Sequence, residues 1–156
     1  MINNTDKKRP LADEISKQGT SNGKLRQKLY AHLLNRIKTS IENGFYLEAV
    51  TLEESFITDR LESYVYYKKL CSPKRTLGDV LNKLLKDADF SKELHAKINE
   101  WRNGRNTSLH EMAKFDAGEE ADWFEKYNKA KAIAEQGKTL LRETDKEILR
   151  LRKLSH

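Results

Sequence analysis

The chain has 156 residues, of which 37% are hydrophobic and 35% charged, and its formal net charge is +6. This length predicts one domain, because domains typically hold about 100–200 residues. No stretch approaches the roughly 18 apolar residues of a membrane-spanning helix, and the polar N-terminus shows no secretory signal. The single cysteine, Cys71, excludes a disulfide framework and multi-cysteine metal sites. We expect a cytoplasmic protein whose modest positive charge makes nucleic acid a candidate partner.

Residues 1–23 are polar and hold few apolar anchors, which predicts a flexible N-terminal tail. From Lys24 onward, apolar residues recur every four positions, as is typical of an amphipathic helix. These residues are Leu25, Leu29, Leu33, Ile37 and Ile41. Asn43-Gly44 is expected to end this helix, because glycine readily takes a left-handed conformation.

A longer second helix is predicted for residues 45–70. Its apolar residues lie on two lines, one with Leu47, Val50, Ile57, Leu61 and Tyr64, the other with Phe45, Ala49, Leu52 and Phe56. A helix that is apolar over so much of its circumference is expected at the centre of the domain. Ser72-Pro73 should end this helix, and residues 77–85 are predicted to form a short third helix.

Two further segments have helical spacing. The first is expected to be capped by Asp89 or Ser91, to carry Leu94, Ile98 and Trp101, and to end at the breaker pair Asn103-Gly104. Another helical turn should then begin near Asn106, since Ser108 and Glu111 have the spacing of a capping box.

The last helix is predicted from about Glu119 to Leu154, with Gly137 as a candidate kink. Strand patterns and internal repeats are missing from the sequence. The elements together predict an all-α fold, a single-domain bundle of about five helices over residues 24–156.

One polar segment carries an unusual pattern, Arg105-Asn106-x3-His110, directly after Asn103-Gly104. The looser pattern of an arginine four to six residues before a histidine also occurs at Arg26 and at Arg150. The tighter form occurs once, and a random chain of this composition would contain about 0.016 copies. At a helix entrance this segment would offer free N–H groups suited to a phosphate.

This motif, in an all-α domain of this size, resembles the HEPN superfamily and its RNase active site. The resemblance implies a metal-independent endoribonuclease without a cofactor, with a composite site across a homodimer. Arg105 would contact the phosphate, His110 would transfer protons, and Asn106 would orient either group. The resemblance further implies a toxin or defence effector that is restrained by an antitoxin or regulatory protein.

Glu54 falls on an apolar line of the predicted second helix. A buried carboxylate needs a partner, so Glu54 is expected to hold Arg105 or to orient His110. HEPN members often carry an acidic residue on this helix, and Glu54 resembles it. The alternative is that Glu54 lies at the edge of the line and extends to water.

Two functions from different classes therefore remain. The first is the endoribonuclease. The second is a non-catalytic helical module that binds RNA or acts as a dimeric adaptor, because Arg105, Asn106 and His110 also fit an ordinary polar helix start. The first function requires Arg105 and His110 to be exposed in one cleft near a dimer interface, and a His110 side chain inside the core of a single chain would exclude it.

Overall fold

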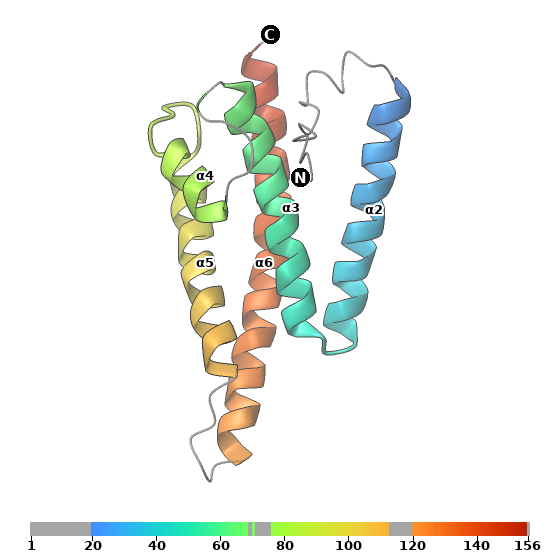
Figure 1. Ribbon diagram of the computed structural model, residues 1–156, viewed down its shortest axis with the longest axis vertical. Helices are drawn as coiled ribbons and strands as arrows, with labels where there is room; N and C mark the ends of the chain where they lie inside the picture. Colours follow the sequence, from blue (N-terminus) through green and yellow to red (C-terminus); the bar gives the residue numbers. More distant parts are fainter. Residues whose placement is uncertain (1–19, 69, 71–75, 113–119, 156) are drawn as a thin grey trace, which may run out of the picture.

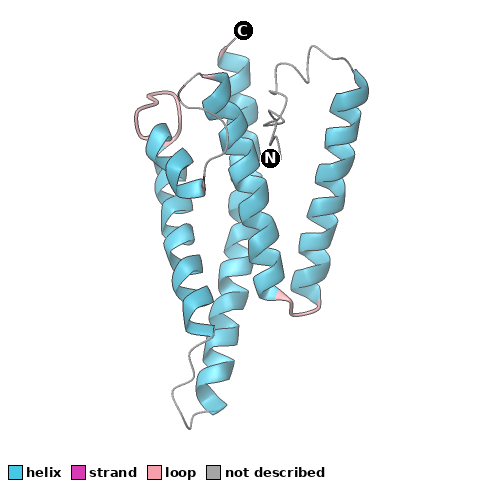
Figure 2. Cartoon of the chain, in the orientation of Figure 1, coloured by secondary structure: helices cyan, strands magenta, loops and turns pink. Residues whose placement is uncertain are grey.

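The computed structural model describes residues 20–68, 70, 76–112 and 120–155. Within them the fold is all-α, as predicted, with five helices and no strand (Figures 1 and 2). The predicted tail lies outside the described residues except for its last four, which belong to the first helix. The predicted break at Ser72-Pro73 also lies outside them.

Helix α2 (Thr20–Glu42) begins four residues before the expected start. A short turn connects it to α3 (Tyr46–Tyr67). The turn is a Schellman motif. The N–H of Gly44 donates to the carbonyl of Ile41, and the N–H of Phe45 donates to the carbonyl of Ser40. Gly44 has a φ of 77°, which only glycine adopts without strain. This confirms the predicted end of the first helix.

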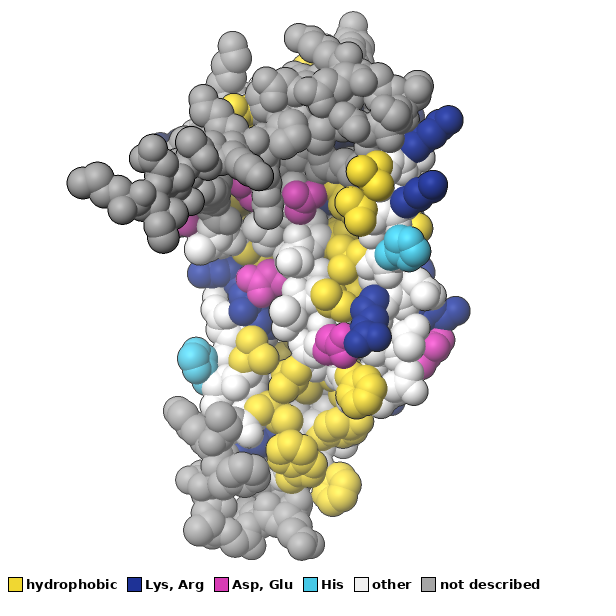
Figure 3. Space-filling view, turned by 45° about the vertical axis from the view of Figure 1, so that its right-hand side comes forward, with side chains coloured by type: hydrophobic (Ala, Val, Ile, Leu, Met, Phe, Trp, Pro, Cys, Tyr) yellow, Lys and Arg dark blue, Asp and Glu magenta, His cyan; other side chains and the backbone are white. Residues whose placement is uncertain are grey.

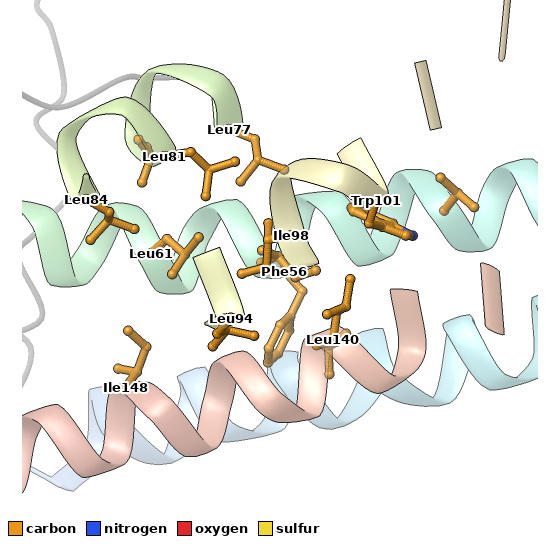
Figure 4. Packing of buried hydrophobic residues seen from close by; sticks show 14 of the residues in the cluster. Phe56, Leu61, Leu77, Leu81, Leu84, Leu94, Ile98, Trp101, Leu140 and Ile148 are labelled. Carbon is orange, nitrogen blue, oxygen red and sulfur yellow. The ribbon is translucent and has the colours of Figure 1, made fainter. Parts of the chain in front are cut away.

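Helix α3 lies at the centre of the bundle, as its apolar circumference predicts. It packs against α2, against the short α4 (Leu77–Leu84) and against α6 (Glu120–Leu154). Side chains from α3, α4, α5 (Lys92–Met112) and α6 meet in one core, to which α5 contributes Leu94, Ile98 and Trp101 (Figure 4). The shared core makes the described helices one domain.

Helix α5 corrects the sequence analysis. It runs without interruption through Asn103-Gly104, so both the predicted break and the new helix start near Asn106 are wrong. Ser108, the predicted cap, is 8% exposed inside the helix. The expected cap at the other end is confirmed, because the N–H of Leu94 donates to Oγ of Ser91 at 3.2 Å.

Helix α6 spans the length of the bundle and continues through Gly137 as one helix (Figure 1). Glycine is needed there for space. A Cβ at Gly137 would overlap the carboxylate of Glu53 and would lie 2.8 Å from Cζ2 of Trp101. Gly137 thus allows α6 to approach α3 and α5 closely.

Candidate active site

The motif residues lie in the last turns of α5, which ends at Met112. Carbonyl groups, not N–H groups, lack helical partners at this end of a helix. The phosphate-binding helix entrance expected at Asn106 is therefore wrong, and any anion here must be bound by side chains.

Arg105 reaches from α5 to α3 and forms an ion pair with Glu54, with Nη2 lying 2.6 Å from Oε1. Both side chains are half-buried, at 18% exposed for Arg105 and 25% for Glu54. Partial burial strengthens a charged hydrogen bond relative to one at the surface. The predicted contact between these two residues is present, and it fixes the position of the guanidinium.

His110 is exposed, and Asn106 is half-buried one helical turn before it. At about 100° per residue, these two side chains lie about 40° apart around α5 and share a face. Arg105 and His110 are separated by about 140° on the same helix. Because α5 is continuous, one chain directs the cation and the histidine to different sides.

A groove of about 860 Å³ lies beside Glu54, between α2, α3 and the first turn of α4. Its acidic lining residues are Glu54, Asp59, Glu62 and Asp79, and its described lining contains no Lys, Arg or His. Each of these four carboxylates has an interaction partner, Arg105 in the case of Glu54.

The most buried carboxylic acid among the described residues was not singled out from the sequence. Glu53 is 0% exposed, and neither of its carboxyl oxygens has a hydrogen-bond partner among the described residues. Burial raises the pKa of Glu53 to about 9, against the smaller opposing effect of the Lys138 charge. A signal was present, since Glu53 continues the second apolar line four residues after Ala49 and three before Phe56.

A second buried ionisable side chain on α3 is Arg60, whose Nη2 lies 2.6 Å from Oδ1 of Asp145 on α6. Its guanidinium also lies over the ring of Tyr30, 5.7 Å from the ring centroid. Arg60 thus has its partner on α6, while Asp59, its neighbour in the sequence, accepts a hydrogen bond from Tyr30.

In the part of the chain that the structure describes, no group of three His, Cys, Asp or Glu side chains could hold a metal ion. Nor is any described helix long and apolar enough to cross a membrane. Comparison with known protein families, with curated proteins and with solved structures gives no match.

Proposed function

We propose that the protein is a HEPN-like, metal-independent endoribonuclease that acts as a homodimer. The observation that carries this proposal is the Arg105–Glu54 ion pair on the helix that exposes His110. A half-buried acidic partner gives an arginine a fixed position, as a phosphate-binding site requires. His110 is exposed, as catalysis requires, whereas Arg105 is half-buried and lies about 140° from it around α5.

The proposed reaction is cleavage by the 2′-hydroxyl of the RNA itself. A neutral imidazole of His110 removes the proton of the 2′-hydroxyl, whose oxygen attacks the adjacent phosphorus. Arg105 stabilises the added negative charge of the phosphorane, and Asn106 orients the phosphate or His110. The bond to the 5′-oxygen breaks when a second imidazolium gives it a proton, which leaves a 2′,3′-cyclic phosphate and a 5′-hydroxyl.

A dimer supplies what one chain lacks. One motif offers one histidine. In the continuous α5, Arg105 and His110 lie about 140° apart around the helix. A two-fold axis would place the motif of a second subunit against the first, so that two histidines and two arginines surround one phosphate. Large apolar side chains at Phe45, Trp123 and Phe124 are exposed, and Figure 3 shows hydrophobic side chains gathered at one end of the molecule. Exposed patches of this kind favour association.

The resemblance to the HEPN superfamily also suggests a biological role. The protein would act in the cytoplasm as a toxin or defence effector, restrained by an antitoxin or regulatory partner. The second candidate function is a non-catalytic RNA-binding or dimeric adaptor module. It is favoured by the engagement of Arg105 with Glu54, which occupies one edge of the guanidinium.

The test is cleavage of mixed cellular RNA in EDTA. Wild-type protein should produce 2′,3′-cyclic phosphate ends, and Arg105→Ala and His110→Ala should each lower the rate by about 100-fold or more. Matched controls are Arg36→Ala, which removes a surface arginine paired with Glu48, and His32→Ala, which removes another exposed histidine. Both controls should retain wild-type activity.

Two results would overturn the proposal. A folded, dimeric wild-type protein that leaves RNA intact would favour the non-catalytic module. Cleavage that persists in Arg105→Ala and His110→Ala would place the active site elsewhere. Circular dichroism of each variant separates loss of chemistry from loss of fold.

A further inference from the structure

A second groove, of about 490 Å³, lies between α2 and α6. Its charged lining residues are Lys38 from α2 and Lys138, Arg142, Asp145 and Lys146 from α6. The groove thus holds four cations and one carboxylate. The charged side chains of this groove are mostly positive, whereas those of the groove beside Glu54, on the other side of α2, are carboxylates.

The cations of α6 form a regular row. Lys138, Arg142 and Lys146 follow one another at four-residue spacing, which places them about 6 Å apart along one side of the helix. Among the described residues, none of the three forms an ion pair. Their charges are therefore available to a ligand.

The one carboxylate of the groove is already engaged. Asp145 is held by the buried Arg60 at 2.6 Å, so its charge is largely compensated from inside the bundle. Lys38, which faces the row from α2, lies 3.8 Å from Glu42 at the exposed surface. An exposed pair at this distance contributes little free energy and can be replaced by contact with an anion.

The apolar lining of the groove is contributed by Leu34, Ile37 and Leu141. Leu34 is exposed although it is a large hydrophobic residue. An open groove with cations in a row and an apolar floor suits the sugar–phosphate backbone of a single strand. The phosphates would lie against Lys138, Arg142 and Lys146, and the sugars would contact the floor.

We infer that the α2–α6 groove is a binding surface for the backbone of single-stranded RNA, formed by Lys38 opposite the row Lys138, Arg142 and Lys146. RNA as the ligand rests on the proposed function, whereas the cationic groove does not. The groove is formed by α2 and α6, whereas the Arg105–Glu54 pair joins α5 to α3. The groove would therefore hold a part of the strand other than the bond that is cut, and bind it without regard to base sequence.

The test measures binding separately from cleavage. A short fluorescent 2′-O-methyl RNA lacks the attacking hydroxyl, so its affinity reports binding alone. The variant Lys138→Gln/Arg142→Gln/Lys146→Gln should weaken binding about tenfold or more near physiological salt. It should also reduce the slope of log K against log salt by about 2, since each phosphate contact on a single strand contributes about 0.7.

The matched control is Lys83→Gln/Lys86→Gln/Lys92→Gln, which removes three positive charges from the region of α4 and the start of α5. Its affinity should stay within about threefold of wild type. Equal weakening of binding in both triple variants would show that only the net charge matters, and would overturn the inference. Wild-type affinity in the groove variant would also overturn it.

Cleavage of unmodified RNA by the same proteins distinguishes the two proposals. Wild-type protein that binds through the groove but never cleaves would refute the nuclease and support the groove. Wild-type protein that cleaves, with a groove variant that binds as tightly as wild type, would support the nuclease and refute the groove.

Discussion

Glu53 and Glu54 are neighbours in the sequence but lie in different surroundings. Glu54 is half-exposed and holds Arg105, whereas Glu53 is fully buried against Gly137 and Trp101. Because burial raises the pKa of Glu53 to about 9, its carboxyl group is protonated in the folded protein at neutral pH. In the unfolded chain the same group ionises near its ordinary pKa of 4.5.

This difference predicts how stability depends on pH. Between about pH 4.5 and 9 the folded state keeps a proton that the unfolded state has lost, so the free energy of unfolding falls as pH rises. The slope due to Glu53 is about 1.4 kcal/mol per pH unit. From pH 6 to pH 8, wild-type protein should lose about 2–3 kcal/mol more than Glu53→Gln, as measured by urea unfolding. As a control, Glu54→Gln should keep the wild-type dependence of unfolding free energy on pH. The same dependence in Glu53→Gln would contradict the prediction.

At the scale of the helix, α5 shows how packing overrides local propensity. Asn103-Gly104 is a breaker pair, yet the helix continues because residues on both sides of it are anchored. Nε1 of Trp101 donates to the carbonyl of Ile133 on α6 at 2.9 Å, and Ser108 is buried further along. Within the helix, Oγ1 of Thr107 donates to the carbonyl of Asn103.

Alanine substitution at two helical glycines is expected to change the free energy of unfolding in opposite directions. A Cβ at Gly104 would meet only Cδ1 of Ile133, at 3.9 Å, so Gly104→Ala should stabilise the protein by about 0.5–1 kcal/mol. A Cβ at Gly137 would overlap Glu53, so Gly137→Ala should destabilise it by about 1–3 kcal/mol. Urea unfolding measures both changes. Destabilisation by Gly104→Ala would indicate that the helix is broken there after all.

The features that the sequence predicted correctly are governed by local signals. Apolar spacing located the five helices, and the conformational freedom of Gly44 and the cap of Ser91 located two of their ends. The continuity of α5 and the burial of Glu53 depend on how α5 and α6 pack, which spacing along one helix does not specify. The contact of Glu54 with Arg105 was predictable because a carboxylate on an apolar line needs a partner.

At the scale of the whole molecule, charge is divided between two sides of α2. Carboxylates line the groove towards α3 and α4, and cations line the groove towards α6. A polyanion is therefore attracted to the side of α2 that faces α6. In a two-fold dimer, each subunit would present one cationic groove, so that a strand could extend from a shared active site onto either subunit.

The proposed composite site predicts that an inactive subunit inhibits an active one. If one phosphate needs His110 from both subunits, a dimer of one wild-type and one His110→Ala chain lacks either the base or the acid. At constant wild-type concentration, about a tenfold excess of His110→Ala should lower the RNA cleavage rate per wild-type chain about tenfold, because nearly all wild-type chains then pair with the variant. The proteins must be mixed long enough for subunits to exchange, and the same concentration of serum albumin should leave the rate unchanged. A constant rate per wild-type chain, with exchange verified by a labelled subunit, would show that each chain carries a complete site and that the 140° separation on α5 is bridged within one subunit.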